Sequence, residues 1–366
     1  MINSVHIENF KNLSDQTITF ERLTVFVGAN GSGKTSVLDA VHKAVDAAVG
    51  DPAKVFVDDA HCDWLHTRGA TADLLVKLTT PGGELSVRAI PATDLLALRH
   101  SLGSRPWSFQ VTPTPGPKFN RVLNQARSLV CFHLDAANLA RASYSESALP
   151  QVEFNGTGLA SVLAYMALND PDGFSALLMH MRNFIPHLRR IRFTKKELGK
   201  PITNVLTIGG GGTIEYVTYR KYQGDVLLFD FNNASDVAAH TVSEGTILLL
   251  GLLTILLGPT QPKILLLDDI EHGLHPLAQK SLLDALKQVM ETFPDLQIIA
   301  TAHSPWLLDQ LQPEQIRLMT LNEAGYAVCG KLTDHPQFEK WKEEMAPGEL
   351  WSLFGEKWLV EEGTEK

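Results

Sequence analysis

Short apolar runs alternate with polar and glycine-containing segments in the N-terminal part of the chain, and this pattern predicts a series of strands. The runs with strand character cover residues 2–10, 17–21, 23–27, 72–78 and 85–90. Pro81-Gly82-Gly83 joins the last two runs, which predicts a hairpin. Residues 36–42 have helical spacing instead, so a helix is expected directly after the third strand.

The hydrophobic period changes again in the middle of the chain. Four prolines between Arg105 and Lys118 interrupt regular structure and predict a surface loop. Residues 159–168 and 173–184 then have helical spacing, and Asn169-Asp170-Pro171-Asp172 between them indicates a stop and a restart. A mostly helical insertion is therefore expected here.

A strand pattern returns from Asn204 to Phe231, around the run Gly209-Gly210-Gly211-Gly212. This glycine run precedes a strand and has no lysine and helix after it, which favours a hairpin loop over a phosphate site. Residues 243–330 then alternate helix and strand, which is typical of the second half of an α/β domain.

Composition and charge narrow the class of protein. The chain has 366 residues, a formal net charge of −9 and a pI near 5.8, which argues against a protein that coats nucleic acid indiscriminately. Its N-terminus lacks a basic-then-apolar signal pattern, and its three cysteines have no metal-type spacing. Residues 246–257 are too few to span a bilayer. We expect a soluble cytoplasmic protein without a membrane partner.

The segment between the third strand and the helix carries the strongest chemical signal. It reads G-x-x-x-x-G-K-T from Gly28 to Thr35, a complete phosphate loop in the strand–loop–helix context that such a loop needs. Backbone N–H groups of the glycine turn wrap a β-phosphate, Lys34 reaches the β/γ oxygens, and Thr35 offers a hydroxyl to Mg²⁺. The residues expected to bind the nucleotide are Asn30, Gly31, Ser32, Gly33, Lys34, Thr35 and Ser36.

Two carboxylates follow a second buried strand. Ile264 to Leu267 is an apolar run that ends in Asp268 and Asp269, the form expected of a Walker B strand. We assign Asp268 to the metal and Asp269 to the attacking water. The alternative is that these acids only cap the helix starting near Pro276.

A third buried strand, residues 296–302, ends at His303-Ser304-Pro305. A neutral histidine at a strand tip can donate a hydrogen bond to a γ-phosphate and respond to its loss. His303 is therefore a candidate for the catalytic site.

In their order along the chain, these motifs resemble those of the ABC-type ATPases of the RecF, SMC and OLD-nuclease group. The resemblance covers residues 1–90 and 230–325 and rests on the phosphate loop, Ser243-Glu244-Gly245, Leu267-Asp268-Asp269, Glu271-His272-Gly273-Leu274-His275-Pro276 and Thr301-Ala302-His303-Ser304-Pro305. It implies an α/β P-loop fold with an ABC-type ATPase head, and ATP with Mg²⁺ as cofactors.

The resemblance also implies roles for individual residues. Ser243 and Gly245 would belong to the signature that contacts the γ-phosphate bound by the opposite subunit of a homodimer. Gly273–Pro276 would be the D-loop and His303 the switch histidine. Lys11 and Asn12, in a turn after the first strand, would lie near the nucleotide.

The sequence departs from the family pattern in several places. The signature is only S-x-G, and no glutamine can be assigned to the Q-loop. Asp269 stands where most relatives carry glutamate, which implies slow hydrolysis, and Glu271 is the reserve base. No coiled-coil heptads interrupt the chain, and the sequence after Gly330 is too short for a Toprim nuclease domain.

Two further segments suggest partners. Arg182, Arg189, Arg190, Arg192, Lys195, Lys196 and Lys200 are clustered, with Glu197 as the one acid among them. Between Arg182 and Lys200 the chain either contacts the phosphates of duplex DNA or forms a solvated edge. The acidic tail contains Trp341, Trp351 and Trp358, which either anchor an effector protein or pack on the chain's own core.

These observations predict an ATP-hydrolysing, ATP-gated homodimer. The expected domains are an N-terminal ATPase lobe (1–90), a mostly helical insertion (91–200), a C-terminal ATPase lobe with signature, Walker B and switch histidine (201–330), and a Trp-rich extension (331–366). One function is the ATPase or sensor subunit of a bacterial defence or toxin system that controls a separate effector. The alternative is a RecF-like DNA-repair ATPase; a transporter ATPase is disfavoured by the degenerate signature.

Overall fold

The computed structural model describes residues 1–57, 65–91, 107–113, 128–208, 212–259, 261–271 and 274–361, in two compact units. Unit 1 comprises Met1–His133 and Pro262–Lys366, and unit 2 comprises Leu134–Gln261. The two compact units meet after His133 and after Gln261, whereas the expected domain boundaries lie after residues 90, 200 and 330. The expected boundaries therefore stay a prediction. The expected proline-rich loop lies mostly outside the described residues.

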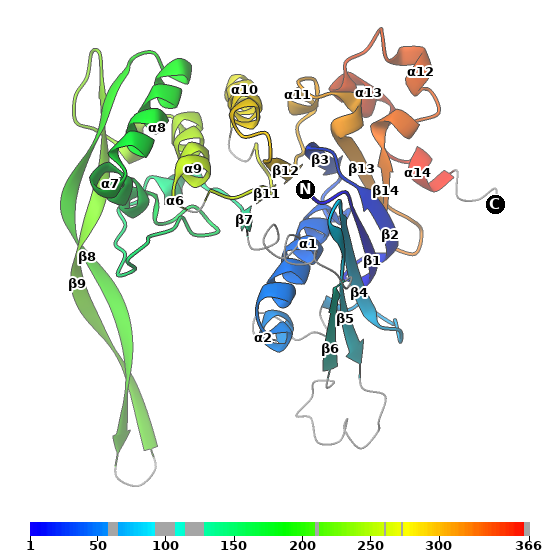
Figure 1. Ribbon diagram of the computed structural model, residues 1–366, viewed down its shortest axis with the longest axis horizontal. Helices are drawn as coiled ribbons and strands as arrows, with labels where there is room; N and C mark the ends of the chain where they lie inside the picture. Colours follow the sequence, from blue (N-terminus) through cyan, green and yellow to red (C-terminus); the bar gives the residue numbers. More distant parts are fainter. Residues whose placement is uncertain are drawn as a thin grey trace. The chain divides into compact units, whose positions relative to one another are not determined.

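A six-stranded, mostly parallel sheet forms the centre of unit 1 (Figure 1). Its order is β14-β13-β3-β12-β11-β7, and only β14 runs antiparallel to its neighbour. The strands are β3 (Leu23–Gly28), β7 (Leu129–Phe132), β11 (Ile264–Leu267), β12 (Gln297–Thr301), β13 (Ile316–Leu321) and β14 (Ala327–Lys331). The three consecutive strands β3, β12 and β11 are buried along their whole length, as continuous apolar runs covered on both faces must be.

A five-stranded antiparallel sheet accompanies it in unit 1, in the order β2-β1-β4-β5-β6. Its strands are β1 (Ser4–Phe10), β2 (Leu13–Thr19), β4 (Leu74–Thr80), β5 (Gly83–Pro91) and β6 (Trp107–Pro113). The hairpin predicted at Pro81-Gly82-Gly83 is confirmed by the pairing of Thr80 with Gly83. The second strand begins at Leu13 rather than at residue 17, because a tight turn after Phe10 pairs that residue directly with Leu13.

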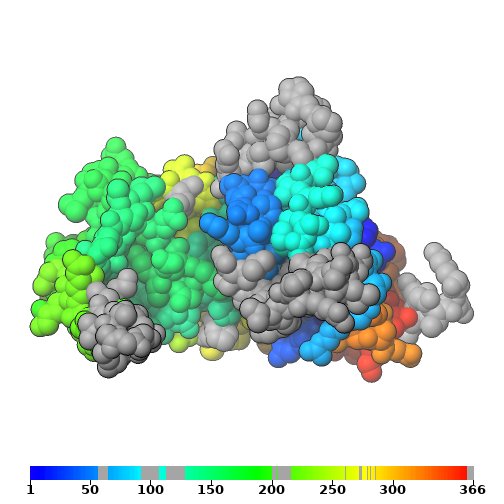
Figure 2. Space-filling view, turned by 90° about the horizontal axis from the view of Figure 1, so that it is seen from below, coloured from blue at the N-terminus to red at the C-terminus, as the bar shows by residue number. Residues whose placement is uncertain are grey.

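Helix α1 (Lys34–Val49) joins the two sheets of unit 1 through one apolar core. Its buried face includes Val37, Leu38 and Val41, which lie in the same cluster as Ile7 of the antiparallel sheet and Leu266 of the parallel sheet. Helix α2 (Pro52–Val57) follows and covers β6, where Phe56 stacks on Phe109 with ring centroids 5.4 Å apart. The blue surface of this helix lies beside the turquoise surface of β6 in Figure 2.

In the described part of unit 1, the remaining helices are α10 (Pro276–Thr292), α11 (Pro305–Leu308), α12 (Phe338–Trp341), α13 (Pro347–Phe354) and α14 (Trp358–Glu361), with short 3-10 turns at Pro313–Gln315 and Leu332–Asp334. The C-terminal extension packs on the core of its own unit. A Cβ atom at Gly348 of α13 would lie 2.0 Å from the carbonyl oxygen of Pro305, and one at Gly330 of β14 would meet Leu359 of α14 at 2.3 Å. Trp358 is buried in this contact, which supports the second of the two interpretations of the tail for that residue.

Unit 2 combines helices with a long two-stranded ribbon. Its elements are α6 (Ala136–Leu139), α7 (Leu159–Asn169), α8 (Pro171–Phe184), β8 (Leu188–Ile208), β9 (Gly212–Phe231), β10 (Val237–Ala238), a 3-10 turn (Ala239–Thr241) and α9 (Glu244–Leu257). The predicted stop and restart between α7 and α8 is confirmed. Asp170 caps α8 by accepting a hydrogen bond from the N–H of Gly173 at 3.0 Å, and Pro171 occupies the first helical position.

The ribbon of β8 and β9 extends well beyond the helices of its unit (Figure 1). The glycine run joins these two antiparallel strands, as predicted, although residues 209–211 lie outside the described part of the chain. The strand pattern starts earlier than Asn204, because Leu188, Ile191 and Phe193 already pair with β9. The basic stretch therefore lies largely on a strand and not at the end of a helical insertion.

Helix α9 is apolar all round and almost entirely buried within unit 2. Among the helices of the described part of the chain, none has the length and apolarity needed to cross a bilayer.

Candidate functional site

The predicted phosphate loop lies between β3 and α1, at the carboxyl end of the central strand. Its backbone needs glycine at two positions in particular. At Gly28, φ is +148° and a Cβ atom would lie 2.0 Å from the carbonyl oxygen of Met319. At Gly33, φ is +102° and a Cβ atom would lie 2.9 Å from that of Ala327. The loop is thus held tightly against β13 and β14, in a conformation that residues with side chains rarely adopt.

Lys34 spans the inside of this loop. Its ammonium group donates hydrogen bonds to the carbonyl oxygens of Gly28 and Ala29 at 2.9 and 3.0 Å. Burial lowers the pKa of Lys34, while the carboxylates of Asp269 and Asp268 act in the opposite direction. A buried cation between carbonyl dipoles and two acids is a ready counter-ion for phosphate.

Two polar atoms beside the loop are buried without a hydrogen-bond partner among the described residues: the hydroxyl of Ser32 and Oδ1 of Asn12. An unsatisfied buried polar atom costs about 1–3 kcal/mol, so a ligand that hydrogen-bonds to these two atoms would relieve that cost. Asn12 also donates to the carbonyl oxygen of Gly31 at 3.1 Å, which places this predicted residue on the loop. The ammonium group of Lys11 forms an ion pair with Asp39 of α1, and its place near the nucleotide stays a prediction.

Thr35 and Asp268 meet at the first turn of α1. The hydroxyl of Thr35 lies 3.0 and 3.2 Å from the two carboxylate oxygens of Asp268. Mg²⁺ prefers oxygen ligands and is held by few protein groups beside substrate phosphates, so this pair fits the predicted metal site. The order of strands brings the two residues together, because β11 is separated from β3 only by β12.

Sequence reasoning missed Thr301, the last residue of β12, which orients both acids. Its hydroxyl donates to Asp268 at 2.7 Å and accepts from the backbone N–H of Asp269 at 2.8 Å. Asp269 itself has a positive φ of 49°, an uncommon conformation that turns the chain away from the strand. Thr301 could have been found from its place at the end of the strand that precedes His303.

His303 and Glu271 complete this edge of the sheet. The ring of His303 lies 3.4 Å from a carboxylate oxygen of Asp269, and its backbone N–H donates to Glu271. Burial and the charge of Lys34 lower the pKa of His303, so the ring is neutral at about pH 7. Burial raises the pKa of Glu271, although the hydrogen bond from His303 opposes this effect.

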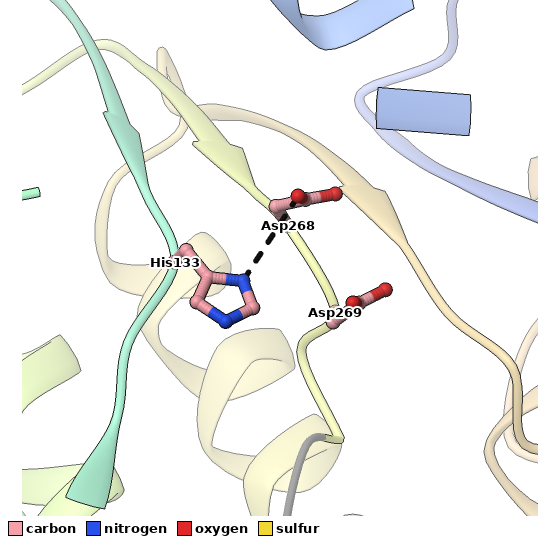
Figure 3. A group of neighbouring side chains, drawn as sticks. All are labelled: His133, Asp268 and Asp269. Carbon is pink, nitrogen blue, oxygen red and sulfur yellow. Dashed lines mark ion pairs between the residues drawn. The ribbon is translucent and has the colours of Figure 1, made fainter. Parts of the chain in front are cut away.

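His133 also lies at this edge, and sequence reasoning did not single it out. It follows β7, as Asp268 and Asp269 follow the adjacent parallel strand β11, and Figure 3 shows its imidazole facing Asp268. Its Nδ1 atom lies 3.9 Å from Asp268, and one ligand atom from each of the three residues falls within 4.8 Å of the others. A histidine directly after an apolar strand run was the available signal.

The predicted signature residues belong to unit 2. Ser243 is the N-cap of α9, where its exposed hydroxyl lies 2.8 Å from that of Thr246, and Gly245 lies in the first turn. In the predicted D-loop, residues 272–273 lie outside the described part of the chain, and His275 caps α10 by accepting from the N–H of Leu277 at 3.4 Å. The cap of α10 is therefore His275 and not the pair of aspartates.

The basic stretch is opposed by more acids than Glu197. Arg190 and Arg192 donate to the buried carboxylate of Asp230 at 2.6 and 2.8 Å. Lys195 pairs with Asp225 at 2.7 Å. No local pattern indicates this neutralisation, because the acids lie on the partner strand, thirty or more positions away. Duplex DNA binding by the whole stretch stays a prediction with less support.

Comparisons with known proteins agree with this geometry. A family described as "AAA domain, putative AbiEii toxin, Type IV TA system" matches residues 23–309, most of the chain. The Retron Vc95 probable ATPase of Vibrio cholerae serotype O1 biovar El Tor is 30% identical over 106 residues. This match covers 26% of the chain and spans only 20% of that relative's length.

Two solved structures share the fold. An SMC head bound to the C-winged helix domain of ScpA is 14% identical with a TM-score of 0.56, over 91% of this chain and 99% of that one. An SMC head domain with an extended coiled coil, bound to the C-terminal domain of ScpA derived from Pyrococcus furiosus, is 13% identical with a TM-score of 0.51, over 94% and 99% of the two chains. The predicted α/β fold class is thereby confirmed. The chain belongs to the AAA-domain family described as putative AbiEii toxin, Type IV TA system, and its fold is that of an ABC-type P-loop ATPase.

Proposed function

We propose that the protein binds ATP with Mg²⁺ and hydrolyses it slowly. The observation that carries this proposal is the meeting of three groups from distant parts of the sequence: the buried ammonium of Lys34, the hydroxyl of Thr35 and the carboxylate of Asp268. A phosphate loop without a metal-binding acid would be an anion site only. With the acid in place, the edge of the sheet can bind Mg·ATP.

Each group has a separate task in this proposal. Lys34 and the N–H groups of the loop bind the β- and γ-phosphates. The hydroxyl of Ser32, which has no other hydrogen-bond partner among the described residues, forms a hydrogen bond with the same phosphates. Thr35 and Asp268 hold Mg²⁺, which neutralises charge on the phosphate oxygens when it is bound.

Asp269 positions the attacking water, and Glu271 is the reserve base. Two observations favour this order. Asp269 is partly exposed and lies beside the neutral ring of His303, so a carboxylate there can accept a proton from water. Glu271 is buried, and one of its oxygens accepts from the backbone N–H of His303, which suits a residue that fixes the histidine.

We further propose that ATP gates a homodimer through the signature at the start of α9. Ser243 is exposed at the N-terminus of a helix of 14 residues, where N–H groups and the helix dipole favour an anion. A γ-phosphate presented by a second subunit would supply that anion. ATP would then stabilise the closed dimer and hydrolysis would release it.

The biological role proposed is that of an ATPase or sensor subunit in a bacterial defence or toxin system with a separate effector. The family description and the retron ATPase relative support this class. The C-terminal extension is the proposed contact for the effector, because Leu353 of α13 and Trp306 of α11 are exposed on two helices that pack together.

Solution mass measurements test the gating. With ATP, the Asp269→Asn variant is expected to shift from monomer to dimer in light scattering, because bound ATP is not consumed. Adding Ser243→Arg places a large side chain where the start of α9 would contact the second subunit. This double variant should therefore have the mass of the monomer. Ser145→Arg, at another exposed serine of unit 2, is the matched control and should leave the dimer intact. An unchanged mass with and without ATP in every variant would remove gating from the proposal.

A further inference from the structure

The two faces of the distal β8–β9 ribbon differ in charge. Strand residues alternate between faces, and the register pairs Lys196 with Gly224, Leu198 with Tyr222 and Lys200 with Arg220. We call the even-numbered positions from 196 to 204 and from 216 to 224 the even face. The odd-numbered positions from 195 to 203 and from 217 to 225 are the odd face.

On the odd face, each lysine forms an ion pair with an acid of the same face. Lys195 pairs with Asp225 directly across the strands at 2.7 Å, and Lys221 pairs with Glu197 at 2.8 Å. The hydrogen bond and charge of Glu197 raise the pKa of Lys221, so the ammonium form is favoured. This face therefore has no excess of positive charge.

The even face contains cations and no acid. Its charged residues are Lys196, Lys200 and Arg220, and the register places Lys200 opposite Arg220. Like charges directly opposite each other destabilise a ribbon, so an excess of cations here needs a reason other than stability. Neither Lys196 nor Arg220 forms an ion pair with another residue of the described chain, and both are exposed.

Aromatic rings lie between these cations. The guanidinium of Arg220 lies over the ring of Tyr222 at 5.4 Å, and this ring packs on Tyr144 with centroids 4.5 Å apart. Tyr216, further along the same face, is 46% exposed. Leu198 lies against Gly224, where an added Cβ atom would be 2.2 Å from the Leu198 side chain. The register places these rings and the cations Lys196 and Arg220 at even positions, on one face.

At the base of the ribbon, the cations of the even face form ion pairs with acids of the same unit. Arg190 and Arg192 also occupy even positions, but Asp230 binds both and Asp236 binds Arg192. The charges of these two arginines are therefore neutralised by acids of the protein itself. Lys196 and Arg220, further along the even face, have no such acid among the described residues.

We propose that the even face of the distal ribbon binds single-stranded nucleic acid. Lys196 and Arg220 would contact phosphates, and the exposed ring of Tyr216 would stack on a base. Exposed rings interleaved with cations are the features by which proteins bind single strands, whereas cations alone would suit a duplex or an acidic protein. A net charge of −9 for the whole chain confines the attraction to this face. The proposal does not depend on ATP hydrolysis.

Fluorescence anisotropy with a labelled single-stranded oligonucleotide of mixed sequence tests the proposal. In the full chain, Lys196→Gln with Arg220→Gln should weaken binding at least about tenfold and reduce the salt slope by about 1.4, since each phosphate contact to a single strand contributes about 0.7. Lys195→Gln with Lys221→Gln removes the same charge from the odd face and should change affinity by less than about twofold. Tyr216→Ala should weaken binding about tenfold without changing the salt slope.

Four results would overturn the proposal. The first is no binding by the parent chain, and the second is an equal loss in both double variants. The third is tighter binding of the matching duplex. The fourth is competition by polyglutamate as effective as that by unlabelled oligonucleotide, which would indicate an acidic protein partner. Circular dichroism melting of each variant distinguishes a lost contact from a lost fold.

Discussion

Charged residues cluster at the carboxyl edge of the six-stranded sheet and on the β8–β9 ribbon, and the two regions hold them differently. At the sheet edge, Lys34, Asp268 and Glu271 are wholly or partly buried, and each is fixed by a backbone or side-chain partner. On the distal ribbon, Lys196 and Arg220 are exposed and lack a carboxylate partner in the described chain. Fixed charges suit a small ligand of defined shape, whereas exposed cations suit a long polyanion of variable shape.

The largest expected effect comes from the buried cation of the sheet edge. Lys34→Ala removes the point charge that the loop offers to the β/γ phosphates, so we expect ATP affinity to fall at least about a hundredfold. Isothermal titration calorimetry with Mg·ATP measures this loss. Lys54→Ala, at an exposed lysine of the same unit, is the control and should bind normally. Near-normal ATP turnover by the Lys34 variant would disprove the site.

The two neighbouring aspartates should separate binding from turnover. Asp269→Asn is expected to keep Mg·ATP affinity and to lower the rate of phosphate release about a hundredfold or more, as loss of a water-positioning base does. Asp268→Asn should instead raise the Mg²⁺ concentration needed for ATP binding, because its oxygens face Thr35. If both variants hydrolyse ATP like the parent, these roles are wrong.

The base of the ribbon tests whether paired charges there are structural. Asp230 is only 3% exposed, and its hydrogen bonds to Arg192 and Arg190 hold the pKa of its carboxyl well below the usual range. A depressed pKa contributes stability above the unfolded value of about 4, and this contribution is lost as the pH falls through the folded value. Asp230→Asn should therefore lower the melting temperature at about pH 7 and flatten its decline in acid. Glu146→Gln, at an exposed acid of unit 2 outside any helix, should do neither.

The smallest effect is expected at Glu271, where burial raises the pKa of the carboxyl. A raised pKa means that the folded state favours the protonated form, so stability is lost as the pH rises through the folded value. Glu271→Gln keeps an oxygen for the N–H of His303 and removes this loss. We expect a higher melting temperature at about pH 8 and no gain at about pH 4, measured by differential scanning fluorimetry. A gain of equal size at both pH values would exclude ionisation as its cause.

Much of the sheet edge followed from local sequence. The phosphate loop and the apolar strands before Asp268 and His303 all depend on residues close together in the chain. Such signals survive folding because strand burial, glycine turns and helix caps are short-range effects. The order of the strands then brings Thr35 and Asp268 together.

His133, Thr301 and the ribbon could not be read in the same way. Nothing in the local sequence says that β7 lies beside β11, which brings His133 to Asp268, or that Thr301 bonds to both aspartates. The local sequence predicts a nearly unopposed basic stretch, because Asp225 and Asp230 approach it only across the hairpin. Strand register alone decides which charges share a face, since a shift of one residue moves every side chain to the other side.

The sequence by itself therefore determined the phosphate loop, the acids after β11 and the class of fold, because these depend on backbone conformation and burial within short segments. Tertiary structure alone decided which charges are neutralised and which remain exposed. Coulomb interactions and hydrogen bonds act over a few ångströms in space, whatever the distance along the chain. On one face of the ribbon, Arg190 and Arg192 are neutralised by Asp230, because the fold brings this acid within a few ångströms of them. Lys196 and Arg220 lie on the same face without such an acid among the described residues.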